Sequence, residues 1–379
     1  MSCRACGAND LGVFYQAGAV PVHASVLCAD QESARAYPRG ELVLAWCQRC
    51  GFIQNTAFDA TRLDYSHDYE ESQAYSPQFR SFVDNLALDL ISRHHLRGKR
   101  VLEIGSGKGD FLVRLCELGD CTGLGFDPGY VAGRVEREGV AFRQENYGRD
   151  TPDVTGDLVV CRHTLEHIAP VYDFLLDLKQ AVARTPRSAL YLEIPETLRI
   201  LRQRAFWDLY YEHCSYFTAG SLGRLLERAG MGLTRSTTGF DDQYLLTEAQ
   251  LGDGDFPPPS DLSLISASVQ DFSSAWDKLR QRWQLRLESA QRPVVWAATS
   301  KTVAFLGAMQ EAAVRIEVAV DINPHKQGAF LPGSGVEIVS PEALADYRPD
   351  LVIAMNPIYL SEIGDDLQRL GVATELEAL

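Results

Sequence analysis

Four of the nine cysteines form two CxxC pairs, Cys3-x-x-Cys6 and Cys47-x-x-Cys50. Each pair presents two thiolates from one tight turn, and two such turns supply the four ligands of a tetrahedral zinc ion. A glycine directly follows each pair and lets the backbone fold round a metal. Redox pairs or disulfides are the alternative, and a reducing compartment disfavours both. Because cysteine fills all four positions, the sequence predicts one structural Zn²⁺ per chain, with no open position for water.

A glycine-rich turn stands in the segment VLEIGSGKGD, residues 101–110. Glycines let a backbone approach a ligand closely, but a GxGxG turn occurs in nucleotide oxidoreductases as well as in methyltransferases. Glu103 precedes the turn, and Asp127 stands at the end of the next expected strand, where a carboxylate accepts both ribose hydroxyls of a nucleoside. This arrangement resembles the S-adenosylmethionine site of class I methyltransferases. The predicted cofactor residues here are Glu103, Gly105, Ser106, Gly107, Asp127 and Pro128, with Glu145 and Asn146 placed to hold the adenine.

Two histidines occur in the segment RHTLEHI, residues 162–168, which follows an expected strand at 157–161. Ligands bind at the carboxyl edge of a doubly wound sheet, and this segment lies at that edge. His163 and His167 are four residues apart, so one helical face could carry both and hold a metal, but the zinc-protease motif HExxH is absent. Local packing is the alternative for both. We expect His167 to act in catalysis or to contact substrate, and His163 to lie at the cofactor.

An aromatic segment, FWDLYYEHCSYFT at residues 206–218, carries the adjacent pair Glu212-His213 between tyrosines. Aromatic walls exclude water and favour a neutral imidazole, which is the form that accepts a proton near pH 7. The alternative is a buried aromatic cluster in the core. The sequence of Tyr-Tyr-Glu-His is unusual for a core, and it predicts a functional site.

The elements that must position these residues are an alternation of strands and helices. The first 70 residues contain short strands, one at 41–46, and residues 77–95 have helical apolar spacing. From residue 100 onward, strand–loop–helix units predict a parallel, doubly wound sheet, and after a linker at 252–261 and a long helical stretch at 264–291 a second, smaller α/β unit begins. The predicted domains are a zinc-binding domain at 1–70, a methyltransferase domain at 71–250 and a C-terminal α/β domain at 262–379.

The charge and hydropathy of the chain argue against nucleic acids and membranes as partners. The chain has 379 residues, with 36 Lys and Arg against 51 Asp and Glu, which gives a net charge of −15. Such a chain repels phosphate backbones, and no basic patch compensates, so we expect no nucleic-acid partner. No apolar run approaches the ~20 residues of a membrane span, and the first residues lack a signal-peptide core. We expect a cytoplasmic monomer or weak homodimer that acts on a small molecule.

The order of these motifs is similar to that of the zinc-containing family of S-adenosylmethionine-dependent C-methyltransferases that act on nucleotide-linked keto sugars. The resemblance covers essentially the whole chain, and it implies a class I (Rossmann-like) core between a small zinc domain and a Rossmann-like C-terminal domain that helps to bind the sugar nucleotide. It implies that His213 is the base, that Tyr210 and Glu212 support it, and that His167 is a second active-site histidine. A Tyr/Ser-rich segment after the zinc domain, with Tyr65, Tyr69, Ser72 and Ser76, is implied to cover the cofactor, although Gln73 interrupts its usual paired serines.

The C-terminal unit contains a second candidate turn, WAATSK at residues 296–301. Small residues and one lysine at a strand–helix turn suit an anion, so Lys301 is a predicted substrate contact together with Tyr65 and Tyr216. A Rossmann unit kept only for its architecture is the alternative.

The expected reaction is a carbon methylation. A ketone acidifies the neighbouring C–H, His213 removes that proton, and Tyr210 or His167 donates to the enolate oxygen. Three other functions remain open from the sequence: an O- or N-methyltransferase with the same cofactor site, a nicotinamide oxidoreductase, and a non-catalytic zinc-stabilised binding module.

Overall fold

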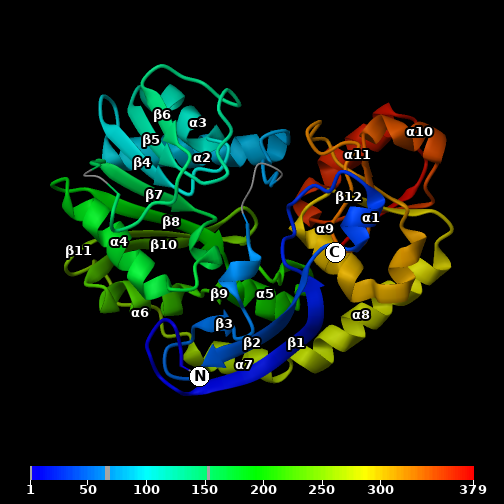
Figure 1. The fold of residues 1–379 in the computed structure, drawn as a ribbon, viewed down its shortest axis with the longest axis horizontal. Helices are drawn as coiled ribbons and strands as arrows, with labels where there is room; N and C mark the ends of the chain where they lie inside the picture. Colours follow the sequence, from blue (N-terminus) through cyan, green and yellow to red (C-terminus); the bar gives the residue numbers. More distant parts are fainter. Residues whose placement is uncertain (1, 65–68, 152–153) are drawn as a thin grey trace.

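The computed structural model describes residues 2–64, 69–151 and 154–379, which form three β-sheets and the helices that cover them (Figure 1). The large central sheet and the C-terminal sheet form two lobes, and the N-terminal sheet runs beneath both. Within these residues, no helix is long and apolar enough to cross a membrane.

The central sheet has seven strands. In spatial order these are β6 (Val140–Arg143), β5 (Thr122–Phe126), β4 (Arg100–Ile104), β7 (Leu158–Arg162), β8 (Ala189–Pro195), β11 (Tyr244–Leu251) and β10 (Met231–Gly239). All strands from β6 to β8 pair in parallel, and β11 is antiparallel to both of its neighbours. This order, with one reversed strand next to the edge, is the topology of a class I methyltransferase, so the expected α/β fold is confirmed.

Helices cover both faces of this sheet because its strands are apolar on both sides. Alternate residues of a strand point to opposite faces. Val101 accordingly packs against α2 (Pro77–His94) and α3 (Asp110–Gly119), and Leu102 packs on the opposite side, where α4 (Val171–Ala183) and α6 (Ala219–Arg228) contribute the apolar partners. A short helix, α5 (Thr197–Gln203), follows β8 and leads toward the aromatic segment.

The C-terminal sheet has five parallel strands. Their spatial order is β14 (Glu337–Val339), β13 (Val318–Val320), β12 (Pro293–Trp296), β15 (Leu351–Ala354) and β16 (Glu375–Ala378). The helices of this lobe are α9 (Ser300–Met309), α10 (Leu344–Tyr347) and α11 (Leu360–Arg369). The chain reverses its direction of winding at β12, so the carboxyl ends of β12 and β15 form a ligand crevice of the Rossmann kind.

The N-terminal sheet is not built from the first 70 residues alone. Its strands are β1 (Leu11–Pro21), β2 (Arg39–Cys47), β3 (Ile53–Asn55) and β9 (Ser215–Tyr216). The short helix α1 (Gln31–Arg35) connects β1 to β2. Strand β9 comes from the aromatic segment of the central domain. The expected zinc domain therefore shares one sheet with residues that directly follow His213.

The helical stretch expected at 264–291 is two helices, α7 (Leu262–Gln270) and α8 (Phe272–Ser289). The chain bends at Asp271 because Phe272 is fully buried, with its ring edge-on to Tyr15 of β1 at 5.4 Å. The expected linker at 252–261 is also tightly held, since the Asp261 carboxylate accepts the backbone N–H of Gly220 at 3.0 Å and pairs with Arg224 at 2.7 Å.

Candidate active site

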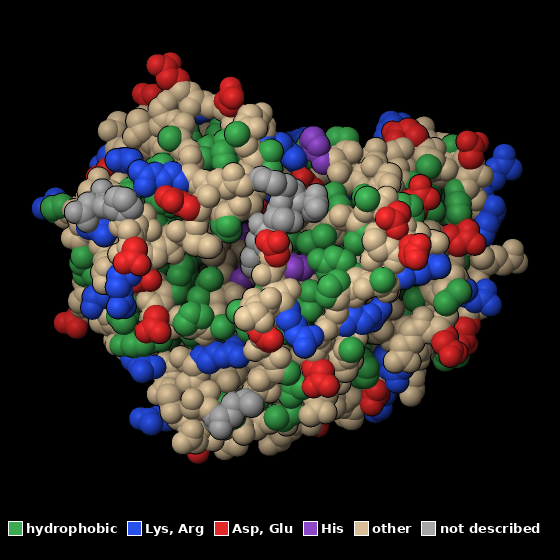
Figure 2. Space-filling model, viewed as in Figure 1, with side chains coloured by type: hydrophobic (Ala, Val, Ile, Leu, Met, Phe, Trp, Pro, Cys, Tyr) green, Lys and Arg blue, Asp and Glu red, His purple; other side chains and the backbone are tan. Residues whose placement is uncertain are grey.

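The two Rossmann-like sheets share one cavity of about 1140 Å³. The turns after β4, β5 and β7 line it from the central domain, and the turns after β12 and β15 line it from the C-terminal domain. Figure 2 shows histidine side chains in the hollow between the two lobes. Parallel strands place their carboxyl-end turns at one edge, so two such edges that face each other create a site for two ligands.

The glycine-rich turn after β4 leaves room that a side chain would fill. Gly105 and Gly107 have φ of +74° and +53°, which favour glycine. A Cβ on Gly105 would lie 1.8 Å from Thr164 Oγ1. The Asp127 carboxylate accepts the backbone N–H of Gly107 at 2.9 Å and that of Gly129 at 2.7 Å, so it is fixed at the edge of the turn. All the predicted cofactor residues line the cavity: Tyr69, Glu103, Gly105, Ser106, Gly107, Asp127, Pro128, Glu145, Asn146 and His163.

Buried polar atoms without partners surround this turn. Glu103 is 2% exposed, and among the described residues neither its Oε2 nor Ser106 Oγ has a hydrogen-bond partner. Burial raises the pKa of Glu103 to about 8. Unsatisfied buried groups are rare in proteins, and at a glycine-rich turn they suit a polar ligand. The turn, the fixed carboxylate and these atoms fit a nucleoside with a positively charged tail, as S-adenosylmethionine has.

His163 is bound to two carboxylates rather than sharing a helical face with His167. Its backbone has φ of +47°, and the short 3₁₀ turn Leu165–His167 replaces the helix expected there. His163 Nε2 lies 2.9 Å from Glu193 Oε1, and Arg162 pairs with the same carboxylate at 2.8 Å. Burial lowers the pKa of His163, but its bonds to Glu166 and Glu193 outweigh this effect and raise the pKa to about 9. His163 is therefore a cationic part of the cavity wall.

His167 and His213 form an edge-to-face pair with ring centres 4.7 Å apart. Tyr210 also stands edge-on to His213 at 4.7 Å, and all three side chains line the cavity. Burial lowers the pKa of His213 well below its usual value, and the neighbouring His167 acts in the same direction. Burial also lowers the pKa of His167. Among the described residues His213 Nδ1 has no hydrogen-bond partner, so this neutral imidazole has a free nitrogen that can accept a proton.

The sequence analysis predicts that Glu212 supports His213, but the Glu212 carboxylate has other partners. It turns the other way, accepts the Ala24 N–H at 2.9 Å and the Tyr69 hydroxyl at 3.1 Å, and lies 4.0 Å from His167 Nδ1. Burial raises the pKa of Glu212 to about 7. The chain bends at residues 211–212, and the adjacent side chains of Glu212 and His213 have separate partners here. Glu212 supports Tyr69 and faces His167.

Asp208 is a site residue that the sequence analysis missed. Its carboxylate accepts the Tyr210 hydroxyl at 3.1 Å and pairs with Lys301 and Arg199, each at 2.5 Å. Burial and the Asp208 charge raise the pKa of Tyr210 well above its usual value, so its hydroxyl keeps its proton. Lys301 lines the cavity at the start of α9, but its ammonium is already neutralised by Asp208. The signal was in the aromatic segment, which places Asp208 two residues before Tyr210.

One predicted substrate contact, Tyr216, does not line the cavity. Tyr216 is 3% exposed and is not among the lining residues; its hydroxyl bonds to the backbone of Tyr210 at 3.2 Å, so it supports Tyr210 from behind. Tyr65 lies outside the described residues. Lining residues that the sequence analysis did not name include Glu71, Arg199, Asp208, Gln243 and Asn356.

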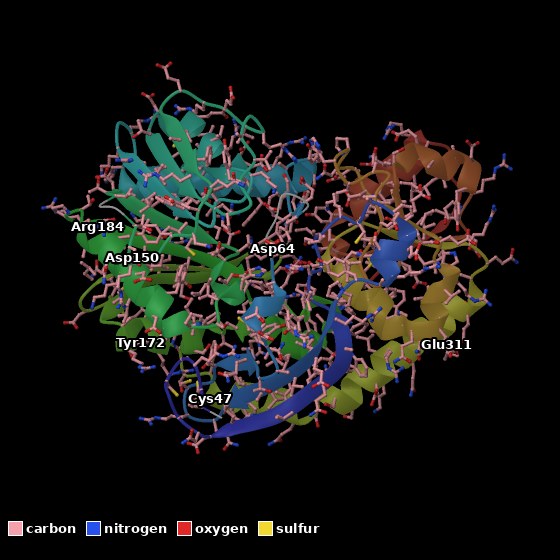
Figure 3. The ribbon with its side chains drawn as sticks, viewed as in Figure 1. Cys47, Asp64, Asp150, Tyr172, Arg184 and Glu311 are labelled. Carbon is pink, nitrogen blue, oxygen red and sulfur yellow. The ribbon has the colours of Figure 1, made fainter. Side chains whose placement is uncertain are left out.

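The four cysteines of the CxxC pairs converge at the end of the molecule near the N-terminus, where Figure 3 labels Cys47. Their sulfur atoms all lie within 4.8 Å of one another, with Cys3–Cys50 and Cys6–Cys47 at 3.6 Å each. Zn–S bonds of about 2.3 Å in a tetrahedron put sulfurs about 3.8 Å apart. None of the cysteines is in a disulfide. The donor set and spacing therefore fit a zinc ion.

Two segments of the chain match known families. Residues 78–235 match a methyltransferase domain, and residues 266–373 match a C-methyltransferase C-terminal domain. A curated relative, the C-methyltransferase NovU of Streptomyces niveus, is 25% identical over 396 aligned positions that span 96% of this chain and 91% of that protein.

Solved structures with a partial likeness include magnesium protoporphyrin IX methyltransferase (ChlM) from Synechocystis PCC 6803 with bound SAH, at 16% identity and a TM-score of 0.37, covering 46% of this chain and 84% of that chain. The DhpI–SAH complex is 22% identical with a TM-score of 0.35, covering 46% of this chain and 88% of that chain. The two matched domains and the sheet topology together support the assignment of this chain as an S-adenosylmethionine-dependent methyltransferase.

Proposed function

We propose that the protein methylates a carbon next to a ketone, in a nucleotide-activated sugar, with His213 as the base. The observation that carries this proposal is the neutral His213 imidazole, with its free Nδ1, in the cavity that the glycine-rich turn also lines. The similarity to a C-methyltransferase over nearly the whole chain supports carbon as the acceptor.

The residues divide the chemistry between them. His213 removes the proton next to the ketone, because its lowered pKa leaves the imidazole neutral at pH 7. The Tyr210 hydroxyl keeps its proton beside Asp208, and it can donate a hydrogen bond to the enolate oxygen instead. When bound, S-adenosylmethionine supplies an electrophilic methyl group. Glu103, Asp127 and the glycine-rich turn would hold it, and the lobes on both sides exclude water from the enolate.

The ligand for the C-terminal side of the cavity is proposed to be the nucleotide part of the substrate. Lys301, Arg199 and Asn356 line that side, and the turn after β12 opens onto it. Because Asp208 already neutralises Lys301, an anion there would compete with Asp208 for this ammonium. The four-cysteine cluster is proposed to hold one structural Zn²⁺, on the sulfur spacing described above.

Incubation with S-adenosylmethionine and a panel of nucleotide-linked keto sugars tests the function. NMR should show a new C–CH₃ group; an O–CH₃ or N–CH₃ product would contradict carbon methylation. In D₂O without S-adenosylmethionine, the wild type should exchange the proton next to the ketone.

The variant His213→Asn should lose this exchange and roughly 10²–10⁴-fold of the methylation rate, since it cannot accept a proton near neutral pH. The matched control is His95→Asn, because His95 is exposed at the end of α2 with φ of +52°, which asparagine tolerates. If His213→Asn still exchanges the proton at the wild-type rate, the base is another group, and His167 is the next candidate.

A further inference from the structure

Residues 69–76, here called the strap, pass between the glycine-rich turn and the C-terminal lobe. Glu70 forms a two-pronged ion pair with Arg134 at 3.0 and 3.1 Å and accepts the Asn323 amide at 3.0 Å. Ser72 donates to the Asp110 carboxylate at 2.7 Å. These contacts fix the backbone on both sides of Glu71.

Glu71 points from the strap onto the glycine-rich turn. Its Oε1 would lie 2.5 Å from a Cβ on Gly107, so a side chain at that position would displace this carboxylate. Among the described residues, the buried Oε2 of Glu71 has no hydrogen-bond partner. Glu71 lines the cavity together with Asp127 and His213. The carboxylate therefore lies at the glycine-rich turn, in the cavity that the proposed base also lines.

Three neighbouring carboxylates already have partners, whereas Glu103 has an unpartnered buried oxygen as Glu71 does. Both oxygens of Asp127 accept backbone N–H groups, Glu70 is paired with Arg134, and Asp110 accepts from Ser72. Glu71 differs from these three because a buried oxygen of its carboxylate has no partner. A buried carboxylate without a donor is costly, and a cationic ligand removes that cost.

We propose that Glu71 is the anionic contact for the positively charged methionine end of S-adenosylmethionine. This inference rests on the proposed function, because it needs the cofactor at the glycine-rich turn. The methionine end carries an ammonium and a sulfonium, and Glu71 lies against the glycine-rich turn that would hold the cofactor. Charge-assisted hydrogen bonds of this kind are roughly twice as strong as neutral ones.

The same geometry couples cofactor binding to proton release. Burial raises the pKa of Glu71 to about 7; Lys108 opposes the rise, and Asp127 and Glu70 add to it. Glu212 is the other charged group that interacts with Glu71, from the side of the base. Lys108 is occupied, since its ammonium donates to the Gly129 carbonyl at 2.7 Å. A bound cation lowers the pKa of Glu71, so the affinity should improve as pH rises through about 7.

Calorimetry with S-adenosylmethionine and with S-adenosylhomocysteine tests the inference. The variant Glu71→Gln keeps the shape and removes the charge, and it should bind S-adenosylmethionine roughly 10- to 100-fold more weakly. Titrations at pH 7 in two buffers of different ionisation enthalpy should show fewer protons released by Glu71→Gln than by the wild type. Glu227→Gln, at an exposed position of α6, makes the same change in net charge and should bind and release protons as the wild type does.

The outcomes separate this inference from the proposed function. Weaker binding of both ligands supports contact with the ammonium, and weaker binding of S-adenosylmethionine alone supports contact with the sulfonium. Unchanged affinity and unchanged proton release in Glu71→Gln would overturn the role of Glu71 and leave the proposed function intact. If the wild type binds neither ligand, the proposed function itself fails, and this inference fails with it.

Discussion

Burial shifts the pKa of many groups in the active site, and it acts in opposite directions on imidazoles and carboxylates. Burial lowers the pKa of His213 well below its usual value and raises the pKa of Glu212 to about 7. His163, a few residues from His167, keeps a pKa of about 9 because two carboxylates bind it. One cavity thus contains a neutral imidazole that can act as base and a cationic imidazole that cannot.

The pH dependence of the reaction follows from the His213 environment. The neutral imidazole is the active form, and its lowered pKa keeps it neutral down to below the ordinary histidine value of 6.5. We therefore expect kcat for methylation to fall only below pH 6.5, because His213 becomes protonated there. The measurement is kcat from pH 4.5 to 8.5 with saturating substrates. An acid limb centred near pH 7 would instead indicate that Glu212 must be ionised.

At the scale of elements, the four-cysteine cluster and the proposed base are parts of one structure. Strand β3 follows the second CxxC pair and pairs with β9, with Gln54 opposite Ser215. Arg4, inside the first CxxC pair, donates to the Asn55 carbonyl at 3.1 Å and to the Cys214 carbonyl at 3.4 Å. The residue before Cys214 is His213. The cysteine cluster therefore fixes the backbone that carries the proposed base.

Loss of the metal should thus reduce activity as well as stability. The variant Cys47→Ser should lose its zinc, because a structural site couples metal binding to folding. Turnover should fall along with the thermal midpoint, since β9 loses its support. Elemental analysis, melting curves and turnover measure these effects, and Cys121→Ser, a buried thiol outside the cluster, should keep one zinc per chain. A Cys47→Ser protein with full activity would separate the cluster from the site, and wild type without zinc would contradict the metal.

Local sequence patterns predict the strands, helices and turns, but contacts between residues far apart in the sequence determine how these elements pair and where their side chains point. The pattern of strands and the glycine-rich turn was enough to predict the central fold and to find residues around Gly105 and Asp127 that line the cavity. It could not show that β9 completes the N-terminal sheet, because that strand is two residues long and pairs across more than 150 positions of sequence. The direction of the Glu212 side chain and the pairing of Lys301 with Asp208 depend on packing between lobes in the same way.

At the scale of the whole molecule, the two lobes are joined around the cavity by polar contacts. Gln243 of the central domain and Asn356 of the C-terminal domain exchange amide hydrogen bonds at 3.0 and 2.9 Å. The strap adds a contact from Gln73 to the Tyr359 hydroxyl at 3.2 Å. These interactions stabilise a closed arrangement and enclose several ionisable groups. The pH dependence of folding therefore depends on groups that the cavity has buried.

The protein without ligands should become less stable as pH rises from 6.5 to 9. Burial raises the pKa of Glu103 to about 8, and the carboxylate bonds of His163 raise its pKa to about 9, so both hold protons in the folded state that the unfolded chain has released. A raised folded-state pKa adds stability below the unfolded value, and this stability is lost as pH rises through the folded value. The histidines whose pKa is lowered act in the opposite direction, but only near pH 6.5, because they are neutral in both states well above their ordinary value of 6.5.

Ionisation of Glu103 alone should lower the free energy of unfolding by about 2 kcal/mol between pH 6.5 and 9. The variant Glu103→Gln cannot ionise, so its thermal midpoint should fall less between pH 6.5 and 9 than that of the wild type, while Glu227→Gln should follow the wild type. Addition of S-adenosylmethionine should flatten the wild-type profile, since its positive charges favour the ionised carboxylates. If the profiles of wild type and Glu103→Gln remain parallel, Glu103 is already ionised in the folded protein at pH 6.5, and its oxygen has a donor that stabilises the charge.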